Sequence, residues 1–147
     1  MINQQDSMPT PAEQPQMVAI ARNSFTIGLP VCAAPSERRF PLTPEGAARL
    51  VEAGYGVRIE SGAASCIHYT DAQYMRAGCR VVTRAEALRC DIVVHLAPLR
   101  YDDVRHLRRG ALVLTLLEPR LQEQRALLAM LERHVVDYVI VGPLHER

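Results

Sequence analysis

The sequence predicts an α/β fold, a parallel sheet of about six strands with helices on both faces. Two observations support this fold class. Short apolar runs alternate along the chain with segments of helical periodicity, the pattern of βαβ units with right-handed crossovers. The later runs are continuously apolar, which suits parallel strands that are covered on both faces and indicates a Rossmann-like sheet. The predicted strands cover approximately residues 24–29, 56–60, 80–82, 91–96, 111–117 and 135–141.

Capping residues mark the predicted starts of the helices. Thr43 supplies a side-chain cap, and Pro44 suits the first helical position, where its missing N–H does no harm. Gly54 can close this first helix. Two capping boxes, in which a Thr is followed three residues later by Gln or Glu, start short helices. The predicted helices therefore begin after Thr43, at the boxes Thr70–Gln73 and Thr83–Glu86, and at about 101–109 and 121–134.

Composition predicts one domain and excludes several classes of function. The 147 residues suffice for one core, and we expect residues 1–23, rich in Gln and Pro, to form a flexible tail before a domain at 24–147. A net charge of +1 predicts no nucleic-acid partner. The absence of a long apolar run or a secretory signal predicts a cytoplasmic protein without a membrane partner. All 17 basic residues are Arg, so no mechanism can use a Lys amine.

The four cysteines predict no metal site. They are widely spaced and form no C-x-x-C pair, so we expect free thiols in a reducing compartment. They are Cys32, Cys66, Cys79 and Cys90.

Chemistry-bearing residues follow several of the predicted strands, where α/β sheets bind ligands. Arg38 and Arg39 lie in the loop after the first strand, and paired guanidiniums can grip a carboxylate. His95 ends the fourth strand and Glu118 follows the fifth, so neighbouring strands would bring them together as an acid–base pair. The alternatives are a solvated basic loop, a core histidine and an exposed loop acid. No G-x-G-x-x-G follows any strand, which leaves no dinucleotide fingerprint.

Several ordered motifs resemble one enzyme family. They are I-G-L-P at 27–30, E-R-R-F-P-L-T-P at 37–44, T-P-E-G-A-A-R-L-V-E-A-G-Y-G-V at 43–57, Y-T-D-A-Q-Y-M-R-A-G at 69–78 and D-I-V-V-H-L-A-P at 91–98. From about Thr26 to Val141 the chain resembles the amino-terminal domain of the alanine dehydrogenase and NAD(P) transhydrogenase alpha-subunit family, and more distantly saccharopine dehydrogenase. The resemblance implies a Rossmann-like domain that holds the substrate, a second domain that binds NAD(P), and catalysis in the cleft between them. It also implies that Arg39 contacts the substrate carboxylate.

Two positions depart from the family pattern. The family's substrate-binding Lys corresponds here to His95, which is mostly neutral at pH 7, and its catalytic His corresponds to Glu118. A carboxylate about 4 Å from a substrate carboxylate repels it by roughly 4 kcal/mol at an effective dielectric of about 20. The family chemistry therefore cannot be transferred unaltered, unless the histidine and the acid have exchanged strands.

The sequence leaves two functional hypotheses. In the first, the chain is the substrate-binding domain of an alanine-dehydrogenase-like oxidoreductase, with a small amino or 2-oxo acid as substrate. We expect no cofactor binding and no turnover from this chain alone, because an NAD-binding domain is absent from it. In the second, the chain is a free-standing, non-catalytic module that binds a small anion or a partner protein. We also expect an uncovered apolar patch, and hence self-association as a homo-oligomer or docking of the missing domain.

Overall fold

The structure is a computed structural model that describes residues 25–32, 34, 37–116, 121–134 and 137–140, with side chains as far as residue 134. The predicted tail at residues 1–23 lies outside the described residues, as does Glu118.

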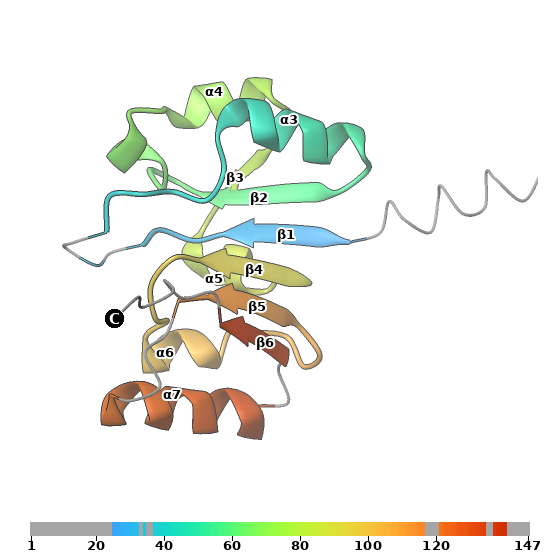
Figure 1. Cartoon of the computed structure of the whole chain (residues 1–147). Helices are drawn as coiled ribbons and strands as arrows, with labels where there is room; N and C mark the ends of the chain where they lie inside the picture. The colour runs from blue at the N-terminus through green and yellow to red at the C-terminus, as the bar shows by residue number, and fades with distance from the viewer. Residues whose placement is uncertain (1–24, 33, 35–36, 117–120, 135–136, 141–147) are drawn as a thin grey trace, which may run out of the picture.

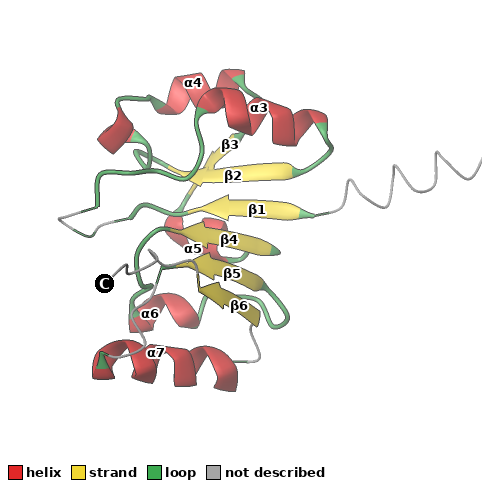
Figure 2. Cartoon of the chain, in the orientation of Figure 1, coloured by secondary structure: helices red, strands yellow, loops and turns green. Residues whose placement is uncertain are grey.

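Six parallel strands form one sheet in the order β3-β2-β1-β4-β5-β6 (Figures 1 and 2). This confirms the predicted fold class. The chain runs outward from β1 through β2 to β3, then returns to the other side of β1 and continues through β4 and β5 to β6. The strands are β1 (Thr26–Leu29), β2 (Gly56–Glu60), β3 (Arg80–Val82), β4 (Ile92–His95), β5 (Leu112–Thr115) and β6 (Asp137–Ile140).

The helices begin where the capping residues predict. The Thr43 side chain accepts the N–H of Gly46 at the start of α3, and both bonds of each capping box are present at α4 and α5. One prediction fails: the helix predicted at 101–109 ends at Val104, because the backbone N–H groups of His106 and Leu107 bond to the carbonyls three residues earlier and form turns instead of continuing the α-helix. The helices are α3 (Pro44–Glu52), the 3-10 helix η1 (Ser65–Ile67), α4 (Asp71–Arg76), α5 (Arg84–Leu88), α6 (Tyr101–Val104) and α7 (Gln122–Arg133).

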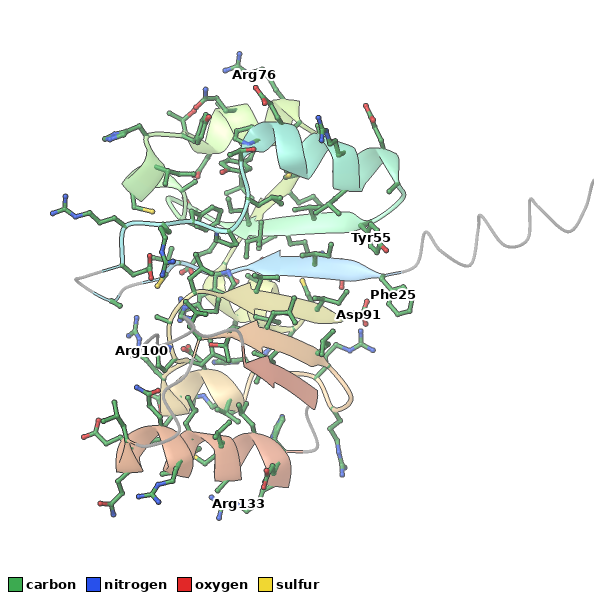
Figure 3. The ribbon with its side chains drawn as sticks, viewed as in Figure 1. Phe25, Tyr55, Arg76, Asp91, Arg100 and Arg133 are labelled. Atoms are coloured by element: carbon green, nitrogen blue, oxygen red, sulfur yellow. The ribbon has the colours of Figure 1, made fainter. Side chains whose placement is uncertain are left out.

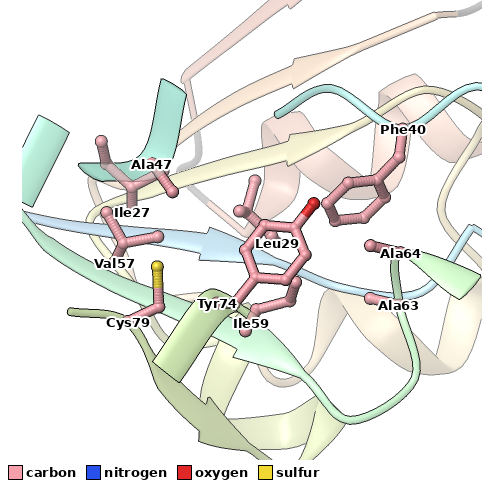
Figure 4. Close-up of a cluster of buried hydrophobic side chains, with 10 residues drawn as sticks. All are labelled: Ile27, Leu29, Phe40, Ala47, Val57, Ile59, Ala63, Ala64, Tyr74 and Cys79. Atoms are coloured by element: carbon pink, nitrogen blue, oxygen red, sulfur yellow. The ribbon is translucent and has the colours of Figure 1, made fainter. Parts of the chain in front are cut away.

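The first face of the sheet carries a core built around Tyr74 of α4. Its ring is fully buried and meets Phe40 edge-on at a centroid distance of 6.2 Å (Figure 4). The ring also meets Tyr69 edge-on at 6.3 Å, and the hydroxyl donates to the carbonyl of Leu42. Desolvation raises the pKa of this phenol to about 12. Because Phe40 and Leu42 belong to the segment between β1 and α3, the same core holds the end of the loop that carries Arg38 and Arg39.

The second face is covered by α5, α6 and α7. Alternate strand residues Val93 and Val113 point to this side and pack with Leu88, Leu127 and Leu131 of the helices. The close approach of α5 to the sheet explains the glycine in β1. A Cβ added to Gly28 would lie 1.8 Å from the backbone oxygen of Ala87 in α5. Helices therefore cover both faces, as the sequence predicts (Figure 2).

Candidate functional site

A pocket lies where the order of the strands reverses, between the carboxyl ends of β1 and β4. Open α/β sheets bind ligands at this switch point, because the loops that leave the two strands diverge and open a crevice. The pocket has a volume of about 220 Å³. Arg100, which follows β4, lies at this edge of the sheet (Figure 3). The lining residues are Ala34, Arg84, His95, Ala97, Pro98 and Arg100.

Arg84, the first residue of α5, organises the floor of this pocket through four hydrogen bonds. Nε and Nη2 donate to the two carboxylate oxygens of Asp103 at 2.9 and 2.8 Å. Nη1 donates to the carbonyl of Val31 at 2.8 Å and to Oε2 of Glu60 at 3.1 Å. The same Glu60 oxygen accepts the backbone N–H of Val31 at 2.6 Å. One guanidinium therefore joins the loop after β1 to the end of β2 and to α6.

The charges of this network stabilise one another. The hydrogen bonds that Arg84 donates to the Asp103 carboxylate raise the pKa of Arg84. Burial by itself would raise the pKa of Asp103, but the bonds from the Arg84 guanidinium and from the Arg100 N–H hold it below its usual range. Asp103 is therefore ionised at neutral pH, and the one Arg84 guanidinium forms ion pairs with both Asp103 and Glu60.

His95 lies behind this network, with only 3% of its surface exposed. Its Nδ1 faces the carbonyl of Ala97, and its Nε2 lies 3.1 Å from the carbonyl of Val31. Desolvation lowers the pKa of the imidazole, although the two carbonyl oxygens act in the opposite direction. A neutral imidazole carries one N–H and can donate to only one of these carbonyls at a time. To exchange a proton with a ligand, the ring would have to release a backbone carbonyl.

Arg38 and Arg39 are both exposed in the loop between β1 and α3. Arg39 forms a two-pronged pair with Glu37, in which Nε and Nη2 each donate to a carboxylate oxygen at 2.9 Å. These bonds lower the pKa of Glu37 to about 2. The side chain of Arg39 remains 70% exposed, whereas that of Glu37 is 12% exposed. The guanidinium is therefore held by a carboxylate in the geometry that a carboxylate ligand would use.

Arg39 does not line the pocket at the switch point, although its loop borders it. Ala34 of the same loop is a lining residue. Burial raises the pKa of the Cys32 thiol, which belongs to the same loop and interacts electrostatically with Glu37 and Arg84. Arg39 and the pocket are thus linked through one loop, the segment between β1 and α3.

The predicted pairing of the fourth and fifth strands is confirmed, since β4 and β5 are neighbours with His95 opposite Thr115. The Thr115 hydroxyl donates to the same Ala97 carbonyl that faces His95. Glu118 follows three residues later but lies outside the described residues, so its approach to His95 stays a prediction.

The described residues contain no group of three or more His, Cys, Asp or Glu side chains that could hold a metal ion. All four cysteines are free. No helix in the described part of the chain is long and apolar enough to cross a membrane.

Sequence reasoning missed Arg84, Glu60, Asp103 and Arg100. Arg84 lies inside the Thr83–Glu86 capping box, where the sequence marks it only as the first residue of a helix. Glu60 carried a usable signal, because it ends a predicted strand at the same edge of the sheet as the other candidates. Nothing local marks Asp103, whose carboxylate is nearly buried and lies within the helix predicted at about 101–109.

Known proteins share this architecture. The family model for the alanine dehydrogenase/PNT N-terminal domain matches residues 28–139. Alanine dehydrogenase of Staphylococcus saprophyticus is 30% identical over 111 residues, which are 75% of this chain and 30% of that protein. Alanine dehydrogenase 2 of Staphylococcus aureus is 28% identical over 112 residues, which are 76% of this chain and 30% of that protein.

Solved structures agree with these sequence matches. An L-alanine dehydrogenase superposes with a TM-score of 0.71 at 28% identity, covering 78% of this chain and 32% of that one. A transhydrogenase from Sinorhizobium meliloti also gives 0.71, at 22% identity, covering 78% of this chain and 34% of that one, and shares the fold. The chain spans about a third of the length of these relatives. The resemblance predicted from the motifs is confirmed: the chain belongs to the alanine dehydrogenase/PNT family and corresponds to the N-terminal domain of that family.

Proposed function

We propose that the chain is the substrate-binding part of an alanine-dehydrogenase-like oxidoreductase, which transfers a hydride between NAD(H) and an amino or 2-oxo acid. The observation that carries this proposal is the Arg39 guanidinium, which is exposed on the loop after β1 and held in a two-pronged carboxylate pair. A substrate carboxylate would replace Glu37 in this pair without a change in the number of charge-assisted bonds. Arg38, also exposed, would support the same anion.

His95 and Glu118 are the proposed proton-handling groups. Burial lowers the pKa of His95 and keeps the imidazole largely neutral. The imidazole would act as a base only after one of its ring nitrogens moves away from the backbone carbonyl that it faces. Rotation of the loop at Val31 would free Nε2, because that carbonyl belongs to the loop that carries Arg39. Glu118 would complete the pair from the neighbouring strand β5, where Thr115 stands opposite His95.

The cofactor would be held by another domain of the enzyme. The loop after β1 contains no G-x-G-x-x-G motif, and the pocket beside it has a volume of only about 220 Å³, below the roughly 300–1,000 Å³ of sites for drug-sized ligands, so these residues do not fit a dinucleotide. When bound elsewhere in the enzyme, the nicotinamide supplies or accepts the hydride. The role left to this chain is to bind and orient the acid, and we expect no NADH oxidation with pyruvate from the chain alone.

Binding of pyruvate and L-alanine to the 147-residue chain, followed by calorimetry or NMR, tests the clamp. Arg39→Ala should abolish binding, because it removes both prongs of the pair. Arg49→Ala is the matched control, since Arg49 is an exposed arginine in the last turn of α3, away from the loop after β1. Glu37→Gln should bind more tightly, because the competing carboxylate is lost. Equal binding by wild type and Arg39→Ala would remove Arg39 from the proposed site.

The second candidate is a non-catalytic module that binds a small anion or a partner protein at the same edge of the sheet. The histidine and glutamate at the family's Lys and His positions favour this alternative. A coding sequence that continues into a strand, a glycine-rich turn and a helix would support the enzyme, whereas anion binding without any such region would support the module. A cytoplasmic location and self-association stay predictions, the second checked by the elution volume on size exclusion.

A further inference from the structure

We propose that the pocket between β1 and β4 takes the second carboxylate of a dicarboxylic amino or 2-oxo acid, and that Arg100 is the residue that contacts it. This inference rests on the proposed function, in which Arg39 holds the first carboxylate. It adds a second binding group and a substrate class to that function.

The charge of the pocket singles out Arg100. The Arg84 guanidinium faces the carboxylates of Glu60 and Asp103, which leaves this network with a net charge of −1. An anion above such a floor would be repelled. Arg100 is the lining residue that compensates the excess negative charge, and it forms no ion pair with a carboxylate in the described part of the chain.

His95 cannot take over this role in its present position. Its two ring nitrogens face the carbonyls of Ala97 and Val31, and desolvation lowers its pKa, so it offers the pocket neither a free donor nor a stable positive charge. The chain also contains no lysine. A cation for a second anionic group must therefore come from an arginine.

The backbone of Arg100 is held in place while its side chain is available. Its N–H donates to Oδ2 of Asp103 at 2.9 Å, which anchors the residue to the same network that forms the pocket floor. Its side chain is exposed and borders the pocket at the carboxyl edge of the sheet (Figure 3). A guanidinium on a fixed backbone loses little freedom when it binds, and its planar fork matches a carboxylate.

The position of the two arginines favours a ligand with two acidic ends. Arg39 belongs to the loop after β1, of which Ala34 lines the pocket, whereas Arg100 follows β4 and lines the pocket itself. A ligand that contacts both arginines therefore needs an acidic group at each end. A monocarboxylic acid such as pyruvate would satisfy one guanidinium only. The remaining walls are the small side chains of Ala34, Ala97 and Pro98, and a pocket of about 220 Å³ has room for a short acid chain.

The test compares dissociation constants of the 147-residue chain for 2-oxoglutarate and pyruvate by calorimetry. Wild type should bind 2-oxoglutarate more tightly. Arg100→Gln should weaken 2-oxoglutarate binding by about 10- to 100-fold, the range for loss of a hydrogen-bonded charge, and leave pyruvate binding unchanged. Arg105→Gln is the matched control: Arg105 is also exposed but does not line this pocket, so both affinities should remain those of wild type. Circular dichroism confirms that each variant is folded.

The outcomes separate this inference from the proposed function. Equal affinity of wild type for the two acids, or 2-oxoglutarate binding that Arg100→Gln does not weaken, would overturn the dicarboxylic-acid assignment. Pyruvate binding lost in Arg39→Ala would still support the clamp. Conversely, selective loss of 2-oxoglutarate binding in Arg100→Gln supports the pocket even where Arg39→Ala leaves pyruvate binding intact. If wild type does not bind 2-oxoglutarate, the inference is wrong.

Discussion

Replacing Arg84 with methionine should lower the free energy of unfolding by about 3 kcal/mol, because it leaves two carboxylates without their partner. The side chain of Arg84 is 21% exposed and those of Asp103 and Glu60 are 7% and 18% exposed, so little water can replace the guanidinium. Breaking a buried pair from one side costs about 3–5 kcal/mol, and the partial exposure of this network places Arg84 at the lower end. Methionine preserves the packing of the aliphatic part of the Arg84 side chain, so the decrease in the free energy of unfolding measures the loss of the guanidinium charge.

Urea unfolding followed by circular dichroism measures this effect, since the chain has no tryptophan. Arg108→Met is the matched control. Arg108 pairs with Asp91 at the opposite edge of the sheet, but its side chain is 56% exposed, and such surface pairs contribute about 0–1 kcal/mol. Equal losses for the two variants, both below about 1 kcal/mol, would refute the view that the Arg84 network stabilises the fold as a buried pair.

The pH dependence of the same variant gives an independent check. Asp103 has its pKa lowered in the folded state, so the stabilisation from its ionised form is fully present above its ordinary pKa of 3.8. It is lost as the pH falls through the lower folded-state pKa. The difference in stability between wild type and Arg84→Met should therefore shrink in acid. An undiminished difference there would show that the guanidinium acts through something other than this carboxylate.

Two further predictions concern the strand and the loop that lead to the site. Gly28→Ala should destabilise the protein by about 3 kcal/mol or more, because the new methyl would clash with the backbone of Ala87. Gly56→Ala is the control, since its new methyl would lie 3.4 Å from the Thr26 side chain, an ordinary van der Waals contact. Equal unfolding midpoints for these variants would contradict the close packing of α5. The Glu37 carboxyl should titrate at about 2 by NMR, and Arg39→Ala should return its pKa toward the ordinary 4.5. A carboxyl that titrates near 4.5 in wild type would show that the pair does not form in solution.

Local signals were sufficient for most of the elements. The threonines at 43, 70 and 83 cap the helices that were predicted to follow them, because a cap needs only a side-chain oxygen and a backbone N–H three residues away. Apolar runs predicted the strands because a continuous apolar segment must be buried in the folded protein, whichever strands lie beside it. The helix predicted at 101–109 was too long, since the residues after Val104 form turns instead.

The sequence by itself therefore determined the fold class, the family and the position of Arg38 and Arg39 in the loop after the first strand, since these follow from local patterns. Only the tertiary structure decided what lies at the switch point. Arg84 meets Asp103, Glu60 and Val31 across 19, 24 and 53 residues, and no local pattern encodes such contacts. The physical reason is that an ion pair depends on distance and burial, which arise only when strands far apart in sequence are laid side by side.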